Sequence, residues 1–423
     1  MKTKTSLTPA AGTSVVVDCC QVCGSEDLTP VLFLGYLPPV NTMPEIDSRP
    51  QEQAGYPAQL LVCNKCSLAQ LGLIVDPRIL FAPEYPYSSG TTKILRDNFA
   101  ELYRDCTGIV SLSKDDLVID IGSNDGTLLS NFNGAHKVLG IEPTLMARKA
   151  IERGIPTEEA FFNAETAQRV RKSVGQAKVI TATNVFAHIP NVHDILDSIL
   201  DLLGKDGVFI SESHYLIGLI ETLQYDTIYH EHLRYYSLTS LNYLLNEHGL
   251  EIAHAKRIPT HGGSIRVYAA RKGTYPVQPT VRQILDAEKK FVSDPNAWTE
   301  FRNRVMLSKL GLHALLRDLK AKGARIFGVG APSRASTLIN YVGLDDAIID
   351  CVVEVSTSHK IGKYMPGTII PVRDEQCLFD EQPQYALLLS WHIADELKHN
   401  LSKKGFRGQY IIPLPVPRVE SHT

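Results

Sequence analysis

The sequence has little that would mark a membrane, secreted or nucleic-acid-binding protein. Its 423 residues contain no run of about 18 apolar residues, the length that a helix needs to cross a bilayer. The basic start of the chain is not followed by an apolar segment, so no signal peptide is predicted. Lys and Arg number 43 against 46 Asp and Glu, a net charge of −3, whereas nucleic-acid binders usually carry a basic excess. We expect a cytoplasmic protein with neither a membrane nor a nucleic acid as its partner.

Internal repeats and low-complexity segments are also absent from the sequence. A hydrophobic fraction of 44% and a charged fraction of 21% are typical of a globular protein. At roughly 150 residues per folding unit, the length predicts about three units. Such a chain buries enough apolar surface to fold without disulfide bonds.

The cysteines are unevenly distributed, because five of the eight lie in the first 66 residues. Two Cys-x-x-Cys pairs stand out, Cys20 with Cys23 and Cys63 with Cys66. Each pair lets two thiolates converge on one tetrahedral ion, and four thiolates complete the coordination shell of Zn²⁺. We predict a structural zinc site from these four residues, with free or redox-active cysteines as the alternative.

Apolar strand-like segments alternate with amphipathic helical segments through the middle of the chain. The predicted strands cover residues 116–122, 137–143, 177–185 and 206–213. This alternation predicts a parallel, doubly wound sheet. A second α/β pattern begins at ARIFGVG, after a long charged helical segment that ends at Gly323. The predicted fold is therefore α/β, with a zinc-binding domain at 1–75, a central Rossmann-type domain at 76–305 and a C-terminal α/β domain at 306–423.

A glycine turn joins the first predicted strand of the central domain to the helix that follows. A dinucleotide-binding fingerprint needs glycines at positions 122, 124 and 127, but the chain has Gly122, Asn124 and Thr127. Asp120 ends this strand, and Glu142 ends the next one, where a ribose-binding carboxylate belongs. An acidic turn without a phosphate cradle disfavours NAD and fits S-adenosylmethionine.

The segment YDTIYHEHLRYYS at 225–237 places two histidines beside a glutamate among tyrosines. The zinc motif HExxH is not present in this segment, and consecutive side chains diverge on a helix, so a metal site is not predicted. A His–Glu pair instead suits a base that titrates near neutral pH. A polar helix start with hydrogen-bonded histidines is the structural alternative.

Two further segments suggest ligand contacts. The tyrosine-rich stretch EYPYSSGTT at 84–92 has the composition of a loop that covers a ligand, although a simple turn fits equally well. The stretch GVGAPSR at 328–334 follows a strand and opens a helix, where free N–H groups and Arg334 suit a phosphate. A turn that only packs the helix against the sheet is the alternative.

Taken in order, the motifs resemble those of one family over nearly the whole chain. The matching segments are CxxC…CxxC, YPYSSG, DIGSNDG, GIEP, NVFAHI, YDTIYHEH, HGGS and KIGKYMPGT. They are similar to the sugar C-methyltransferases that act on nucleotide-linked 4-keto-deoxysugars in antibiotic-sugar biosynthesis. The resemblance implies methyl transfer from S-adenosylmethionine to the carbon next to the ketone, after a histidine base forms the enolate. It also implies an N-terminal zinc-binding domain and a C-terminal α/β domain on the side of the nucleotide.

The resemblance also implies roles for individual residues. His232 would be the base with Glu231 as its partner, and Tyr229, His188 and a tyrosine of the YPY loop (Tyr87 or Tyr85) would surround the ketone. The residues implied to bind S-adenosylmethionine are Ser88, Ser89, Gly90, Asp120, Gly122, Asn124, Asp125, Gly126, Glu142, Phe161, Phe162 and Asn184. The residues expected on the substrate side are His261, Gly262, Gly330, Ser333, Arg334 and Lys360.

The chain departs from the family pattern on the substrate side. Ser213-His214-Tyr215 stands where the sugar enzymes carry Asp-Pro-Tyr, Glu354 begins a segment that is usually Asp-x-x-Pro, and His392 replaces an asparagine. O- or N-methylation of another small molecule, and an inactive zinc-ribbon adaptor, are therefore kept as alternatives.

Overall fold

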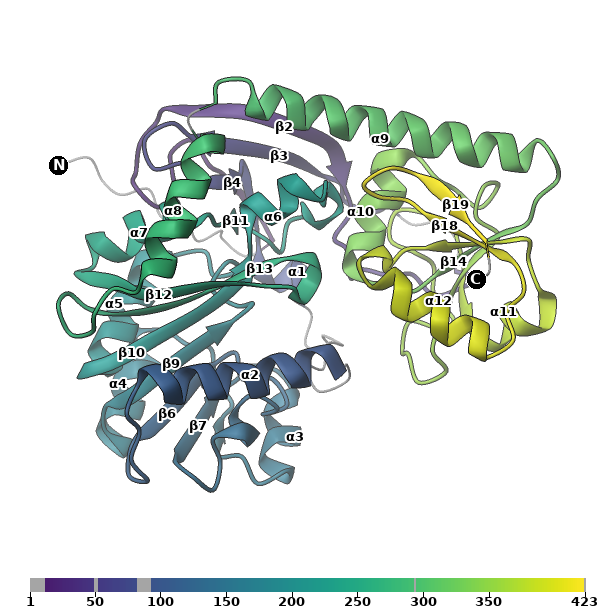
Figure 1. Cartoon of the computed structure of the whole chain (residues 1–423). Helices are drawn as coiled ribbons and strands as arrows, with labels where there is room; N and C mark the ends of the chain where they lie inside the picture. Colours follow the sequence, from purple (N-terminus) through teal and green to yellow (C-terminus); the bar gives the residue numbers. More distant parts are fainter. Residues whose placement is uncertain (1–11, 49–51, 82–92, 293, 422–423) are drawn as a thin grey trace.

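Three larger sheets and one two-stranded sheet organise the chain in a computed structural model, which describes residues 12–48, 52–81, 93–292 and 294–421 (Figure 1). The N-terminal sheet and the central sheet lie side by side, and the C-terminal sheet lies across from them (Figure 1). Among these described residues, no helix is long and apolar enough to span a membrane.

The N-terminal region contains an antiparallel sheet, and one strand of this sheet, β11, comes from the central region of the chain. Its order is β11-β4-β3-β2. The strands are β2 (Leu28–Leu37), β3 (Tyr56–Cys63), β4 (Ala69–Leu71) and β11 (Arg234–Tyr235), and beside them lie β1 (Ser14–Val16), β5 (Leu73–Val75) and α1 (Pro77–Leu80). Arg234 of β11 pairs with Gln70 of β4. The segment that contains His232 is therefore joined directly to the N-terminal sheet.

The central region is a seven-stranded sheet with the order β12-β13-β10-β9-β6-β7-β8, in which β13 alone runs antiparallel to the other strands. Its strands are β6 (Leu117–Ile121), β7 (Lys137–Ile141), β8 (Thr157–Glu158), β9 (Ala177–Thr183), β10 (Leu203–His214), β12 (Leu250–Ile258) and β13 (Ser264–Arg271). Every residue of β6 is buried, as expected for a strand covered on both faces. The sheet confirms the predicted Rossmann-type α/β fold.

Helices cover both faces of the central sheet. They are α2 (Lys93–Ile109), α3 (Met146–Glu152), α4 (Ala164–Val174), α5 (Val192–Leu202) and α7 (Leu238–Glu247), whereas the short helix α6 (Leu216–Glu221) packs in the core cluster of the N-terminal and C-terminal regions. In α5 the buried apolar residues Val192, Ile195, Leu196 and Ile199 recur at helical spacing, so one stripe of the helix packs on the sheet.

Two helices connect the central and C-terminal regions, α8 (Pro279–Val292) and α9 (Ala297–Lys320). Helix α9 is continuous, and the expected domain boundary between residues 305 and 306 falls inside it. It extends from the N-terminal sheet to the C-terminal region (Figure 1). Buried Phe301, Val305, Leu312 and Leu316 lie along one side of it.

The C-terminal region is a second doubly wound sheet with the order β16-β15-β14-β17-β18-β19, parallel except for β19. The strands are β14 (Ile326–Val329), β15 (Cys351–Glu354), β16 (Val372–Asp374), β17 (Tyr385–Leu388), β18 (Gln409–Ile412) and β19 (Arg418–Glu420), and the helices are α10 (Ser333–Val342), α11 (Gln376–Glu381) and α12 (Ala394–Lys403). From the central strand β14 the chain proceeds outward to β15 and β16, and it then returns to β17 on the other side of β14, so the strand order reverses between β14 and β17. Ligands of doubly wound folds bind at this switch point.

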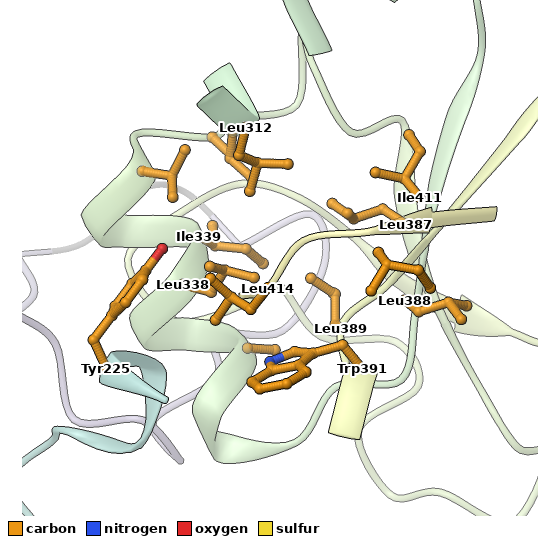
Figure 2. Close-up of a cluster of buried hydrophobic side chains, with 14 of the residues drawn as sticks. Tyr225, Leu312, Leu338, Ile339, Leu387, Leu388, Leu389, Trp391, Ile411 and Leu414 are labelled. Carbon is orange, nitrogen blue, oxygen red and sulfur yellow. The ribbon is translucent and has the colours of Figure 1, made fainter. Parts of the chain in front are cut away.

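The core of the C-terminal region also packs against the rest of the chain. Leu338 and Ile339 of α10 face Leu387 and Leu388 of β17, while Tyr225 approaches α10 from the central region (Figure 2). Tyr225 is fully buried, and its ring lies 5.2 Å from that of Tyr341. The segment that precedes His232 is therefore held between the central and C-terminal regions.

Candidate active site

The four predicted zinc ligands converge at one end of the N-terminal sheet. The Sγ atoms of Cys20, Cys23, Cys63 and Cys66 all lie within 4.8 Å of one another. Cys20 lies 3.4 Å from Cys66, and Cys23 lies 3.4 Å from Cys63, each measured between sulfurs. Ligands about 2.3 Å from a tetrahedral ion have nearly this separation, so the cluster fits Zn²⁺. Cys19 is not a member of it.

The glycine turn after β6 forms the predicted cofactor edge of the central sheet. Gly122 has φ of +68°, and an added Cβ would lie 2.5 Å from a methyl group of Val185. Glu142 accepts hydrogen bonds from the backbone N–H of Asn124 at 2.9 Å and of Thr144 at 2.9 Å. These bonds fix the carboxylate beside the turn, and each oxygen keeps a second lone pair for a ribose hydroxyl.

Asp120 differs from Glu142 in its surroundings. It is 2% exposed and accepts a hydrogen bond from the Thr181 hydroxyl at 2.6 Å. Burial raises the pKa of this carboxyl from 3.8 to about 7. The Asp120 carboxyl therefore lies inside the sheet, at the end of β6, and its hydrogen bond goes to Thr181 of the neighbouring strand β9.

The other expected cofactor residues lie around the same edge with different degrees of exposure. Asp125 accepts hydrogen bonds from the backbone and hydroxyl of Thr127, so its carboxylate also holds the turn together. Phe162 is buried, whereas Phe161 is 71% exposed. Gly126 has φ of +74° within the same turn. Tyr85, Tyr87, Ser88, Ser89 and Gly90 lie outside the described residues.

Two buried polar atoms at this edge have no hydrogen-bond partner among the described residues. They are the Ser123 hydroxyl of the glycine turn and the Oδ1 atom of Asn184, which follows β9. The Ser123 hydroxyl faces Gly140 of β7, within the sheet, whereas Asn184 lies beside the histidine His261. Buried polar atoms are nearly always hydrogen-bonded, so the Asn184 oxygen, together with Glu142, fits a polar ligand such as S-adenosylmethionine.

Four histidines and a tyrosine gather at the carboxyl ends of β9 and β10. The ring of His232 lies 4.2 Å from that of Tyr229, 4.7 Å from that of His214 and 4.9 Å from that of His188, measured between centroids. His214 lies 5.6 Å from His261. The Asn184 amide lies 3.4 Å from Nε2 of His261. The cofactor edge and this histidine cluster are therefore contiguous.

Backbone carbonyls fix the tautomers of two of these imidazoles. The Nδ1 atom of His232 lies 2.7 Å from the Thr227 carbonyl, and that of His188 lies 2.6 Å from the Glu231 carbonyl. Because a carbonyl only accepts, each Nδ1 carries the proton, and in the neutral ring each Nε2 carries a lone pair. His232 thus has the arrangement of a base with its accepting nitrogen at Nε2.

The histidines are held in their neutral form. Burial lowers the pKa of His188 and of His261 to about 4. Burial, and then the nearby imidazoles and Arg334, lower the pKa of His232 well below 6.5. At neutral pH each ring is therefore unprotonated on one nitrogen.

The expected pairing of His232 with Glu231 requires a correction. The hydrogen bond to Nδ1 of His232 goes to the Thr227 carbonyl, while a carboxylate oxygen of Glu231 accepts from the Asn41 side chain at 2.6 Å. Asn41 also accepts from the hydroxyl of Ser333 at 3.3 Å. Glu231 therefore lies where the N-terminal, central and C-terminal regions meet. Consecutive side chains diverge, so His232 and Glu231 point to different partners.

Arg334 also differs from its expected role as a phosphate ligand. Its Nε and Nη2 atoms each donate to Asp226 at 2.8 Å, and Nη2 donates to Gln224 at 3.2 Å. The Trp391 indole donates to the same carboxylate at 2.7 Å. The main contact of the Arg334 guanidinium is therefore with the Asp226 carboxylate of the protein itself, and not with a ligand phosphate.

The remaining substrate-side residues lie near this junction. Gly330 has φ of +83° in the turn after β14, and an added Cβ would lie 2.7 Å from the Ser390 hydroxyl. Lys360 donates to the Ala331 carbonyl at 2.6 Å. Gly262 accepts through its carbonyl from the Gln224 amide. Gly330 and Lys360 border the carboxyl end of β14, whereas Gly262 lies between β12 and β13 of the central region.

Comparisons with known proteins agree with this layout. Family models match at residues 20–81 ("Putative zinc binding domain"), 94–255 ("Methyltransferase domain") and 259–415 ("C-methyltransferase C-terminal domain"). The C-methyltransferase NovU of Streptomyces niveus is 33% identical over 412 residues, which cover 96% of this chain and 97% of that protein.

The chain belongs to the C-methyltransferase family. It is an S-adenosylmethionine-dependent methyltransferase with an N-terminal zinc-binding domain. Among solved structures, magnesium protoporphyrin IX methyltransferase of Synechocystis PCC 6803 aligns over 42% of this chain and 83% of that chain, with 16% identity and a TM-score of 0.34. The "putative methyltransferase" in complex with the Trm112 methyltransferase activator of Haloferax volcanii gives 14% identity, coverage of 42% of this chain and 92% of that chain, and a TM-score of 0.33.

Sequence reasoning missed several residues that shape the site of this C-methyltransferase. His214 was noted only as a departure from a pattern, yet it lies within the histidine cluster. Arg234 is fully buried and donates to the carbonyls of Phe186 and Ile189, which position the loop that carries His188. The position of His214 at the end of a parallel strand was the available signal, because such ends meet at one edge of the sheet.

Proposed function

We propose that this C-methyltransferase methylates the carbon next to the ketone of a nucleotide-linked 4-keto-deoxysugar, with His232 as the base. The observation that carries the proposal is the orientation of His232. Its Nδ1–H is bound by the Thr227 carbonyl, and its Nε2 lone pair is left for a substrate proton. A hydrogen beside a ketone is weakly acidic, so its removal needs a positioned base and a donor to the enolate oxygen.

The residues around His232 fit this chemistry. Nε2 takes the proton from the carbon, the C–H electron pair forms the enolate double bond, and negative charge collects on the former ketone oxygen. The Tyr229 ring lies at 35° to the imidazole and holds it in place, and burial keeps the Tyr229 pKa well above 10, so the hydroxyl stays a donor. S-adenosylmethionine supplies the electrophilic methyl group that the enolate carbon requires. Glu142, Gly122 and Asn184 would hold this cofactor at the adjoining edge.

The C-terminal sheet supports a nucleotide as the handle of the substrate. Its turn after β14 repeats the arrangement at the cofactor edge: Glu354, which ends β15, accepts from the backbone N–H of Ala331 at 2.6 Å, as Glu142 accepts from Asn124. An acid in this position of a doubly wound fold binds ribose hydroxyls. Near the ends of β17 and β18 lies a cavity of about 420 Å³, lined in part by Trp391, His392 and Arg418.

Proton exchange tests this function without the methyl donor. The protein is incubated in deuterium oxide with a dTDP-4-keto-6-deoxysugar, and NMR follows the hydrogens beside the ketone. Exchange at one carbon, followed by C-methylation there when S-adenosylmethionine is added, is the expected result. Methylation at oxygen or nitrogen, or no exchange at all, would refute the proposal.

A further inference from the structure

The imidazoles of the cluster differ in what they can offer a substrate. His188 and His232 each use Nδ1–H on a backbone carbonyl, so when neutral they only accept at Nε2. His261 shares its Nε2 with the Asn184 amide. For His214, no hydrogen bond to either ring nitrogen occurs among the described residues. His214 is thus the imidazole whose tautomer is not fixed by the described protein.

The position of His214 is well defined although its nitrogens have no such partner. It is the last residue of β10, and its backbone pairs with Ser264 of β13. Its ring meets that of His232 edge to face, at 76° and 4.7 Å between centroids. The His214 side chain is half-buried, and because its ring contacts that of His232, the two rings border a common space. In a ketone whose neighbouring carbon lies at Nε2 of His232, the oxygen is two bonds away from that carbon, and the ring of His214 lies only 4.7 Å from that of His232.

We propose that His214 is a further catalytic residue, which donates a hydrogen bond from its neutral imidazole to the ketone oxygen of the substrate as the enolate forms. This inference rests on the proposed function, because it assumes a ketone at His232. It assigns the two adjacent imidazoles opposite tasks, one accepting the proton and the other stabilising the oxygen.

The step balances without a further reactant. The C–H bond breaks and its proton forms an N–H bond at Nε2 of His232. The C–H electron pair becomes the new C=C bond, and the carbonyl π pair moves onto oxygen. The hydrogen bond from the N–H of His214 to that oxygen shortens, but the proton of His214 is not transferred. The proton on His232 later passes to solvent.

The surroundings of His214 support a neutral donor. The charged and titratable groups that face it are His232, His261, His188 and the guanidinium of Arg334, which is paired with Asp226. Burial is the main cause that lowers the pKa of His214 well below 6.5, and these groups add to it. A neutral imidazole polarises a carbonyl without protonating it.

Deuterium exchange separates this role from packing, with Leu and Gln in place of His214. His214→Leu removes the donor and should slow exchange beside the ketone by about 10²-fold, the scale for one lost oxyanion donor. The dissociation constant of the sugar nucleotide should stay within about threefold, since the bond strengthens mainly in the transition state. His214→Gln keeps an N–H donor, so its exchange should be at least tenfold faster than that of His214→Leu.

His254→Gln is the matched control, because His254 on β12 bonds to the Thr280 hydroxyl outside the cluster. It should exchange at the wild-type rate, and melting temperature and S-adenosylmethionine affinity confirm that each variant is folded. Wild-type exchange in His214→Leu, or equal rates in the Leu and Gln variants, would overturn the donor role while leaving the proposed function intact. Absence of exchange in the wild-type protein would overturn both.

Discussion

Arg334 and Asp226 form a buried bidentate ion pair between the C-terminal region and the segment that leads to His232. Two nitrogens of the guanidinium each lie 2.8 Å from a carboxylate oxygen, and the side chains are 7% and 0% exposed. Asp226 immediately precedes Thr227, whose carbonyl orients His232. The pair therefore connects the packing of the C-terminal sheet with the orientation of the base.

Removing one partner of this pair should destabilise the protein strongly. Asp226→Leu leaves a buried guanidinium without its counter-charge, and a loss of about 3–5 kcal/mol in the free energy of unfolding is expected. The double variant Asp226→Leu with Arg334→Met removes both charges and should recover a large part of that loss. Urea unfolding of wild-type, single and double variants measures both values. A double variant as unstable as the single one would contradict this account.

Replacement of the base should separate turnover from cofactor binding. His232→Asn should reduce exchange and methylation by about 10²–10⁴-fold, the scale of a lost general base. The affinity for S-adenosylmethionine, measured by calorimetry, should not change, because the expected cofactor contacts lie at Glu142 and the glycine turn. Near wild-type turnover in this variant would show that His232 is not the base.

The pH dependence of the free energy of unfolding should reveal the lowered pKa of His392. Burial, with Arg334 nearby, lowers its pKa from 6.5 to about 2. Below pH 6.5 the unfolded chain takes up a proton here that the folded chain does not, so stability falls as pH decreases toward 2. The slope from this group approaches about 1.4 kcal/mol per pH unit. His392→Gln should therefore lose stability less steeply than wild type between pH 6 and 4.5 in urea titrations, and equal slopes would contradict the shift.

Local pattern sufficed to predict the parts of the molecule that depend on nearby residues. The two Cys-x-x-Cys pairs and the apolar strand at 117–121 each carry their own signal, and the structure places them as expected. The partners of Arg334 and His232 were not predictable in this way. Arg334 lies 108 residues from Asp226, and His232 binds a carbonyl, which every residue has. Side-chain identity therefore predicted which chemistry gathers at the site, while its orientation depends on tertiary packing.

Glu142 should determine affinity for the methyl donor. Its carboxylate accepts two backbone N–H groups and faces the turn that is expected to hold the ribose. A hydrogen bond to a charged group contributes about 1.5–3 kcal/mol, so Glu142→Ala should weaken S-adenosylmethionine binding by roughly 10–100-fold. Glu152→Ala, at an exposed position on α3, is the control and should bind as wild type does. Calorimetric titration measures both affinities. Unchanged affinity for Glu142→Ala would show that Glu142 does not bind the ribose.

Loss of one zinc ligand should also impair the active site, because the buried Arg234 connects the two sites. Cys63→Ser opens the tetrahedral shell, so the purified protein should contain less zinc and its N-terminal region should melt at lower temperature. Gln21, between the first two ligands, accepts from Arg234 at 2.7 Å, and Arg234 also binds the Phe186 carbonyl near His188. Methyl transfer should therefore slow, although no ligand touches the histidine cluster. Cys19→Ser, outside the cluster, should keep both metal and turnover, so equal zinc content in the two variants would disprove the four-cysteine site.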